Sequence, residues 1–193
     1  MAKQQTKAQP TWTDVKANLA KFDRAALLAV VQHLYAATAS NRAFLHARFG
    51  LGGDPLQPYR NTIHRWLWPD IFQGQETSVS RAKAAISEYK KAIGDPAGLA
   101  ELMVFYCERA AGFCHDVGHT DPAYFDALAR MFGHALHTTR ILAPNAQSQL
   151  LSRLDQVRII GRQLGYGVGD DMDVLLAEFD SSFQARGVAW REK

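Results

Sequence analysis

The chain has 193 residues, of which 47% are hydrophobic and 21% charged, and its formal net charge is +3. This length suits a single domain, and the ordinary proportions exclude a fibrous repeat and a wholly disordered protein. The longest uninterrupted apolar run, residues 25–31, is far shorter than the stretch of about 18 residues that indicates a membrane-spanning helix.

The N-terminal residues and the cysteine content bear on the compartment. Residues 1–10 are polar and contain no apolar core of the kind that a secretory signal peptide needs. Two cysteines, Cys107 and Cys114, are too few for the disulfide framework of a small secreted domain. We therefore expect a cytoplasmic protein that has no membrane partner.

Charge is unevenly distributed along the chain. Residues 1–94 contain 13 Lys and Arg against 6 Asp and Glu, whereas residues 95–193 contain 9 against 13. A basic region of this kind can attract nucleic acid or an acidic partner, but it does not identify a fold.

Eight segments have apolar residues at the spacing of amphipathic helices, and no alternating strand pattern of useful length appears. Asp23 and Ser78 have the residue types that cap helix starts, and Asp95 and Asp121 each precede a proline, which is well tolerated in a first turn. Pro69 ends the third segment, because proline disfavours helical geometry in the preceding residue. In chain order, the expected helices span residues 12–22, 23–49, 56–67, 78–93, 95–117, 121–136, 145–164 and 172–183.

Short connections between these segments predict an all-α, single-domain antiparallel helical array of about seven to eight helices. The domain is expected over residues 11–186, between a flexible N-terminal tail at 1–10 and a flexible C-terminus at 187–193. The second expected helix has a weak point at Ser40 and Asn41, whose side chains compete for backbone hydrogen bonds.

Residues 78–110 read SVSRAKAAISEYKKAIGDPAGLAELMVFYCERA, a helix that leads through a proline turn into a second helix. This stretch resembles the central block of an uncharacterised bacterial family catalogued as domain of unknown function 6155. The N-terminal segment through Phe49 and the turn GYGVGDDM at 165–172 are also similar, so the likeness spans most of the chain. The resemblance implies an all-helical bacterial protein, and it implies no activity and no functional residues.

Cysteines and histidines near the end of the fifth expected helix are the first candidates for chemistry. At about 100° per residue, Cys107 and Cys114 lie on the apolar stripe and are expected in the core. His115 and His119 lie on the other side with Glu108, and two histidines at i and i+4 can share a divalent metal ion with a carboxylate. Alternatively, the following glycine ends the helix first, and the histidines are favoured there by the helix dipole.

The sixth expected helix has two further histidines, His134 and His137, on its polar face. They lie there with Asp126 and Arg130, which are spaced at i and i+4 like an ordinary surface ion pair. A site shared with the histidines of the fifth helix would require two polar faces to turn toward each other. Because burial favours the opposite orientation, we expect no such joint site.

The best candidate for an interaction surface combines basic and aromatic residues: Arg60, Arg65, Trp68, Lys83 and Lys90. Cations pair with phosphates and aromatic rings stack on bases, so this set suits single-stranded nucleic acid as well as a protein partner. The competing interpretation is that tryptophans at helical spacing belong to the core. Trp68 falls off the apolar face of its segment, which favours an exposed anchor for a partner.

No coherent catalytic set emerges from the sequence. We therefore expect a non-enzymatic helical interaction module without a cofactor, which self-associates or binds a protein partner through the basic and aromatic surface, with nucleic acid as a second kind of partner. The alternative is a metal-binding helical protein, and conceivably a metal-dependent enzyme, that holds a divalent ion with Glu108, His115 and His119.

Overall fold

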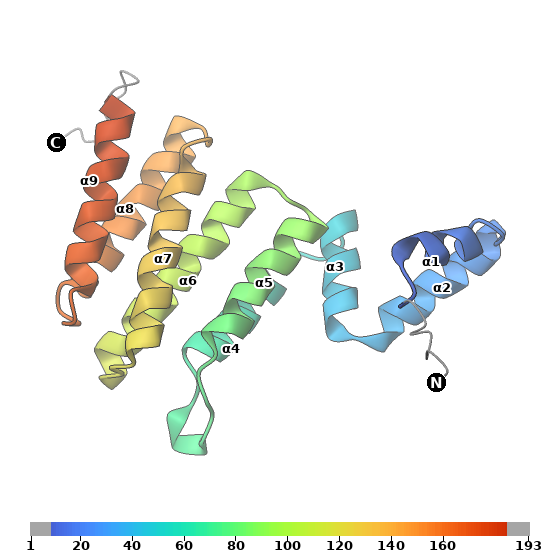
Figure 1. Ribbon diagram of the computed structural model, residues 1–193, viewed down its shortest axis with the longest axis horizontal. Helices are drawn as coiled ribbons and strands as arrows, with labels where there is room; N and C mark the ends of the chain where they lie inside the picture. The colour runs from blue at the N-terminus through green and yellow to red at the C-terminus, as the bar shows by residue number, and fades with distance from the viewer. Residues whose placement is uncertain (1–8, 185–193) are drawn as a thin grey trace, which may run out of the picture. The chain divides into compact units, whose positions relative to one another are not determined.

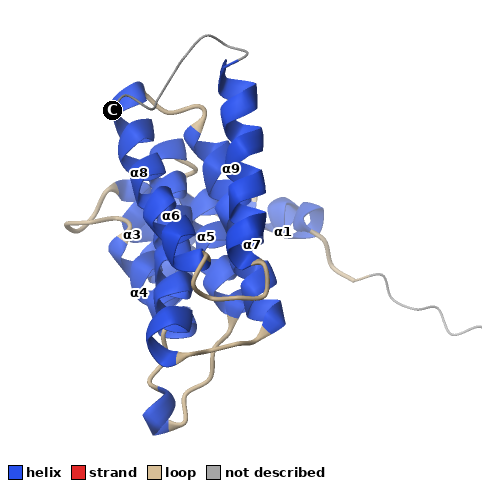
Figure 2. Ribbon diagram, turned by 90° about the vertical axis from the view of Figure 1, so that its left-hand side faces the viewer, coloured by secondary structure: helices blue, strands red, loops and turns tan. Residues whose placement is uncertain are grey.

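The structure is a computed structural model that describes residues 9–184 (Figures 1 and 2). Over these residues it contains helices and no strand, so the predicted all-α fold class is confirmed. None of the described helices combines the length and the apolar character needed to cross a bilayer. The elements are α1 (Trp12–Leu19), α2 (Arg24–Ala37), α3 (Ala39–Phe49), α4 (Gln57–Leu67), a short 3-10 helix (Ile71–Gln73), α5 (Val79–Ala92), α6 (Pro96–Val117), α7 (Pro122–Thr139), α8 (Pro144–Gly161) and α9 (Val168–Gln184).

The second expected helix is in fact two helices, α2 and α3, because the backbone of Thr38 is extended, with φ −143° and ψ 154°. The Thr38 hydroxyl accepts a hydrogen bond of 3.0 Å from the backbone N–H of Asn41. The Asn41 side chain donates one of 2.6 Å to the carbonyl of Leu34. Both side chains satisfy backbone groups that the break leaves without helical partners, close to the predicted weak point.

Contacts divide the chain into two compact units, Met1–Leu45 and His46–Lys193. The division falls within α3, so a continuous helix contributes to both units. The predicted flexible ends, 1–10 and 187–193, lie almost entirely outside the described residues.

The N-terminal unit has well-formed helix starts. Asp14 accepts a hydrogen bond of 2.7 Å from the backbone N–H of Thr11, and Asp23 accepts one of 2.7 Å from that of Ala26. Although these helix starts have capping hydrogen bonds, none of the residues of α1, α2 or α3 is buried. The helices of this unit therefore form without a core of their own.

The second unit is built around α6. This helix packs against α4, α5, α7 and α8, and α9 completes the antiparallel array against α7 and α8 (Figure 1). Asp95 and Asp121 cap α6 and α7 ahead of their prolines, as predicted, each through a hydrogen bond of 2.8 Å to a backbone N–H. Buried residues cover most of the circumference of α6, and its remaining face carries partly exposed residues such as Glu101 and Glu108.

Candidate functional site

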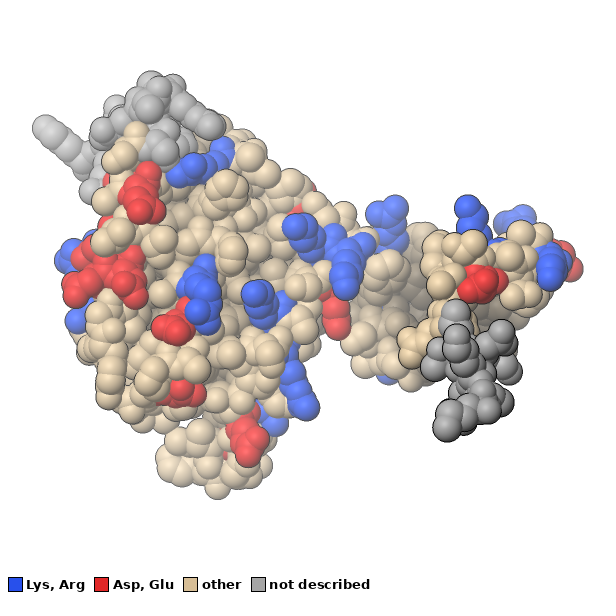
Figure 3. Space-filling model, viewed as in Figure 1, with Lys and Arg blue, Asp and Glu red and all other residues tan. Residues whose placement is uncertain are grey.

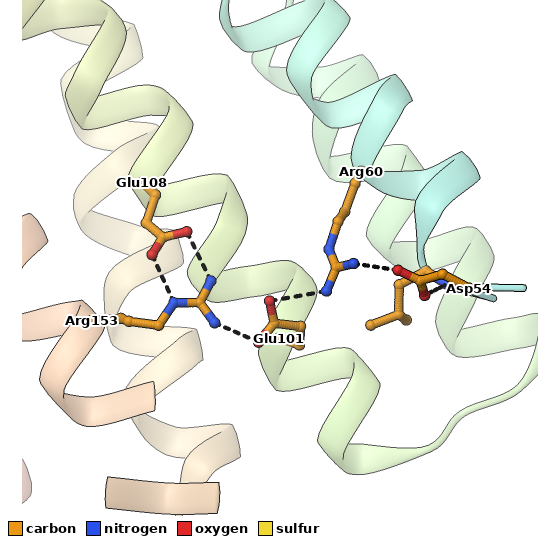
Figure 4. A network of polar contacts seen from close by, with 6 residues as sticks. Asp54, Arg60, Glu101, Glu108 and Arg153 are labelled. Atoms are coloured by element: carbon orange, nitrogen blue, oxygen red, sulfur yellow. Dashed lines mark hydrogen bonds and ion pairs between the residues drawn. The ribbon is translucent and has the colours of Figure 1, made fainter. Parts of the chain in front are cut away.

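A network of charged side chains joins α4, α6 and α8 (Figure 4). Arg153 of α8 donates two hydrogen bonds of 2.8 Å to the Glu108 carboxylate and one of 2.6 Å to Glu101. Arg60 of α4 donates to the other oxygen of Glu101 at 3.1 Å and also pairs with Asp54. Two of the residues singled out from the sequence, Arg60 and Glu108, are therefore engaged within the second unit.

The electrostatics of this network suit a structural role. The hydrogen bonds that Arg153 donates to Glu108 are the largest cause of the raised pKa of its guanidinium, and the one that it donates to Glu101 adds to it. A two-pronged contact between a guanidinium and a carboxylate is among the strongest polar contacts in proteins. Glu108 accordingly uses both of its oxygens on Arg153.

The other two residues of the predicted metal site do not join Glu108. The His115 ring contacts Asp116 through Nδ1 at 2.9 Å and Gln163 through Nε2 at 3.1 Å. The α6 helix ends at Val117, and Gly118 then takes the left-handed conformation, with φ 70°. His119 consequently leaves the helical register that placed it one turn after His115.

His119 lies among aromatic rings instead. Its ring centroid is 5.2 Å from that of Phe113 and 5.0 Å from that of Tyr124. Its Nε2 atom is buried and has no hydrogen-bond partner in the part of the chain that the structure describes. Within that part, no group of three or more His, Cys, Asp or Glu residues is placed to hold a metal ion.

Both thiols are buried, which confirms that the cysteines belong to the core. Burial is the main cause of a raised pKa at Cys107 and raises the pKa of Cys114 to about 12. At neutral pH both side chains are thiols, which pack as small apolar groups and are poor nucleophiles.

Trp68, the expected anchor for a partner, packs against α6 and is only partly exposed. A Cβ atom at Gly112 would lie 2.7 Å from the Trp68 ring, so the glycine leaves the space that the indole occupies. The Phe113 ring centroid is 6.3 Å away, and the Arg109 guanidinium lies 5.1 Å from the ring centroid. Trp68 therefore contributes to the packing of α4 on α6.

The remaining cations of the predicted surface are exposed. The guanidinium groups of Arg65 and Arg81 lie 4.7 and 4.3 Å from the Trp66 ring centroid. Lys83 and Lys90 of α5 form no ion pair with another described residue. Figure 3 shows Lys and Arg interspersed with Asp and Glu on the face in view, rather than gathered into one large basic patch.

The apolar side of α1 and α2 is exposed. Trp12, Leu28 and Leu34 expose 68%, 60% and 54% of their surface. Their helical spacing is typical of a buried stripe, and spacing alone does not distinguish a buried stripe from an exposed one. We call the following residues the N-terminal apolar stripes: Trp12, Val15, Phe22, Leu27, Leu28, Val31 and Leu34.

Comparison of the chain with protein-family models, curated proteins and solved structures finds no significant match. The likeness of residues 78–110 to an uncharacterised bacterial family therefore stays a prediction. Arguments about function rest on the geometry of the side chains.

Proposed function

We propose that the protein is a non-enzymatic helical interaction module that associates with a second copy of itself through the N-terminal apolar stripes. The observation that carries the proposal is that α1 and α2 expose large apolar side chains while burying none of their residues. The buried thiols, and the carboxylates paired with Arg60 and Arg153, support an interaction role over a catalytic one.

Helix length supports the need for a partner. The 8 residues of α1 and the 14 residues of α2 are close to or below the length at which isolated helices are marginal in water. Most helical stability in proteins comes from packing an apolar face, and the N-terminal unit supplies little of that packing itself. Association would supply the missing burial.

The area of the stripes fits a protein interface. Their exposed fractions correspond to apolar surface on the order of 700 Å², and a standard interface buries about 800 Å² per partner. The stripes are thus large enough to form the centre of a dimer.

Charge favours a second copy as the occupant. Residues 25–41, which include nearly all of α2, contain no Lys, Arg, Asp or Glu. Two copies can therefore approach along α2 without repulsion between like charges. A partner selected by electrostatic complementarity would find no Lys, Arg, Asp or Glu to recognise on α2 after Arg24.

The basic and aromatic residues support a partner surface less well than the stripes do. Arg60 is paired with two carboxylates and Trp68 packs on Gly112, so both already have contacts within the second unit. Arg65, Lys83 and Lys90 remain exposed, but three cations give a weak electrostatic footprint for nucleic acid.

Sedimentation velocity of the full chain over a range of concentrations tests the proposal. We expect the wild-type protein to shift from monomer to dimer with rising concentration, and Leu28→Asp with Leu34→Asp to remain monomeric. The matched control is Ile141→Asp, which introduces the same charge at an apolar residue that is 71% exposed in the second unit. It is expected to dimerise like the wild type.

Three outcomes would contradict self-association through the stripes. One is a wild-type protein that remains monomeric at every concentration, which is the result expected if other residues of the chain cover the stripes. Another is a dimer that persists in the Leu28→Asp, Leu34→Asp variant, and the third is equal loss of dimer in the Ile141→Asp control. Far-UV circular dichroism of each variant reports whether the second unit stays folded.

A further inference from the structure

A small pocket lies between α5, α6 and α7 in the second unit, away from the N-terminal apolar stripes. Its volume is about 120 Å³, which leaves room for a group of a few non-hydrogen atoms. The polar residues that line it come from all three helices: Ser80 and Lys83 from α5, Tyr106 from α6, and Arg130 and His134 from α7.

The polar side chains of this pocket are mostly cationic, and Val79, Ala127 and Met131 complete a surface that is more apolar than polar. Lys83 and Arg130 carry permanent positive charges, His134 adds an ionisable imidazole, and no carboxylate is among the lining residues. The nearest acidic contact is a long one of 3.7 Å between Arg130 and Asp126, both of them well exposed, and such surface pairs contribute little. The pocket therefore has a positive potential that an anion would neutralise.

Tyr106 provides a second and independent indication of a ligand. Its side chain is 1% exposed and lines the pocket, yet its hydroxyl makes no hydrogen bond to another described residue. Burial is the main cause that raises the pKa of this hydroxyl, Cys107 adds to the rise, and the positive charge of Arg130, which lines the same pocket, lowers it. A hydroxyl that faces a pocket beside a cation and has no partner among the described residues is a donor that an oxyanion can satisfy.

We propose that this pocket binds a phosphate group. Lysine and arginine are the usual phosphate ligands in proteins, and the Ser80 and Tyr106 hydroxyls add two donors for a group that has several acceptor oxygens. The limited volume suits the phosphate group itself, and any organic part would extend beyond the pocket.

The surface on the other side of α7 can receive such an extension. Arg130 and His134 also line a wider, open depression of about 630 Å³ between α7 and α9, with Asp171, Val174 and Leu175 on its α9 side. Its surface is mostly apolar, so it suits the organic part of a phosphate monoester rather than a second anion.

Calorimetric titration of the full chain with inorganic phosphate and with phenyl phosphate tests the site at constant ionic strength. We expect saturable binding of at least one of them, tighter for phenyl phosphate if the organic part uses the depression. Titration with phenol alone should give no comparable binding.

Lys83→Met and Lys90→Met form the matched pair of variants, because both remove one charge from an exposed position of α5 and only Lys83 lines the pocket. We expect Lys83→Met to weaken phosphate binding about tenfold and Lys90→Met to leave it nearly unchanged. Tyr106→Phe should weaken binding about threefold or more, because it removes one donor and leaves the ring.

The proposal fails if neither phosphate compound binds saturably. It also fails if Lys83→Met and Lys90→Met weaken binding equally, because equal losses are expected when binding depends only on the overall charge of the surface. Binding of single-stranded oligonucleotide, lost to the same extent in both lysine variants, would also overturn it in favour of a nucleic-acid surface. Should Tyr106→Phe unfold the protein, the lysine pair still decides. The outcome does not depend on dimerisation, so this site and the proposed self-association can fail separately.

Discussion

Helices α2 and α7 have similar amphipathic patterns and opposite surroundings. In α7 the apolar stripe is covered by neighbouring helices, so that Leu128 and Phe132 are fully buried. In α2 the corresponding stripe is open, and Leu28 is 60% exposed. A hydrophobic stripe therefore predicts a helix and identifies its apolar side. Whether other helices bury that side depends on residues far away in the sequence.

The two units also differ in how their helices are held. Each end of α6 is capped, and the helix contacts four others through residues on most of its circumference. The starts of α1 and α2 have equally good capping contacts, but no residue of either helix is buried. The capping contacts at the helix starts are therefore as good in the N-terminal unit as in the second unit. The two units differ in how much packing stabilises their helices.

The largest expected effect comes from the same substitution, leucine to alanine, made once in each unit. Leu128→Ala should lower the free energy of unfolding by about 3 kcal/mol, because it leaves a cavity in a closed core. Leu28→Ala in dilute, monomeric protein should change it by less than about 0.5 kcal/mol. Urea titration followed by far-UV circular dichroism measures both, and equal losses would remove the distinction between the units.

The same comparison can be made with one tryptophan from each unit. We expect Trp68→Ala to cost about 2 kcal/mol, because the indole fills the space over Gly112 beside Phe113. Trp12→Ala, at a residue that is mostly exposed, should have little effect on the unfolding of the second unit. A Trp68→Ala variant of unchanged stability that had lost a binding partner would instead support Trp68 as an exposed anchor.

A smaller effect is expected from the charged network. Arg153→Met leaves the carboxylate of Glu108 without a guanidinium partner and Glu101 with Arg60 alone, and it should lower the free energy of unfolding by about 1–2 kcal/mol. Adding Glu108→Met should restore part of this loss, because it removes the unpaired charge. Thermal unfolding at several salt concentrations measures both variants, and an Arg153→Met protein as stable as the wild type would show that the network adds nothing.

The smallest effect concerns His115. A hydrogen bond to Asp116 is the main cause that raises the pKa of this imidazole above its ordinary value of about 6.5. The folded state then binds the proton more tightly, so the contribution to stability is full below about pH 6.5 and is lost as the pH rises through the higher folded pKa.

An NMR titration of the His115 ring checks this shift, with Asp116→Asn as the variant that should lower the pKa toward its ordinary value. A His115 pKa that is the same in wild type and Asp116→Asn would contradict the assigned cause.

Local features of the fold could be predicted from the sequence. Asp95 and Asp121 mark the starts of α6 and α7, and the core positions of Cys107 and Cys114 follow from helical periodicity. Each of these features depends on residues within a few turns of one another, where helix geometry fixes the directions of the side chains.

Features that depend on distant contacts could not be predicted. Arg153 binds carboxylates 45 and 52 positions earlier in the chain, and nothing in its own neighbourhood selects those partners. The phosphate pocket likewise needs three helices to bring Lys83, Tyr106 and Arg130 together. The separation of His115 from His119 is an intermediate case, because it depends on whether Gly118 ends α6, and the sequence left that choice open.

Hydrogen–deuterium exchange measured by mass spectrometry at low and high protein concentration tests the contrast between the units most directly. The account predicts fast exchange of α2 amides at low concentration, slower exchange as dimers form, and slow exchange of α6 amides at every concentration. Amides of α2 that are already as protected as those of α6 at low concentration, and unaffected by concentration, would contradict it.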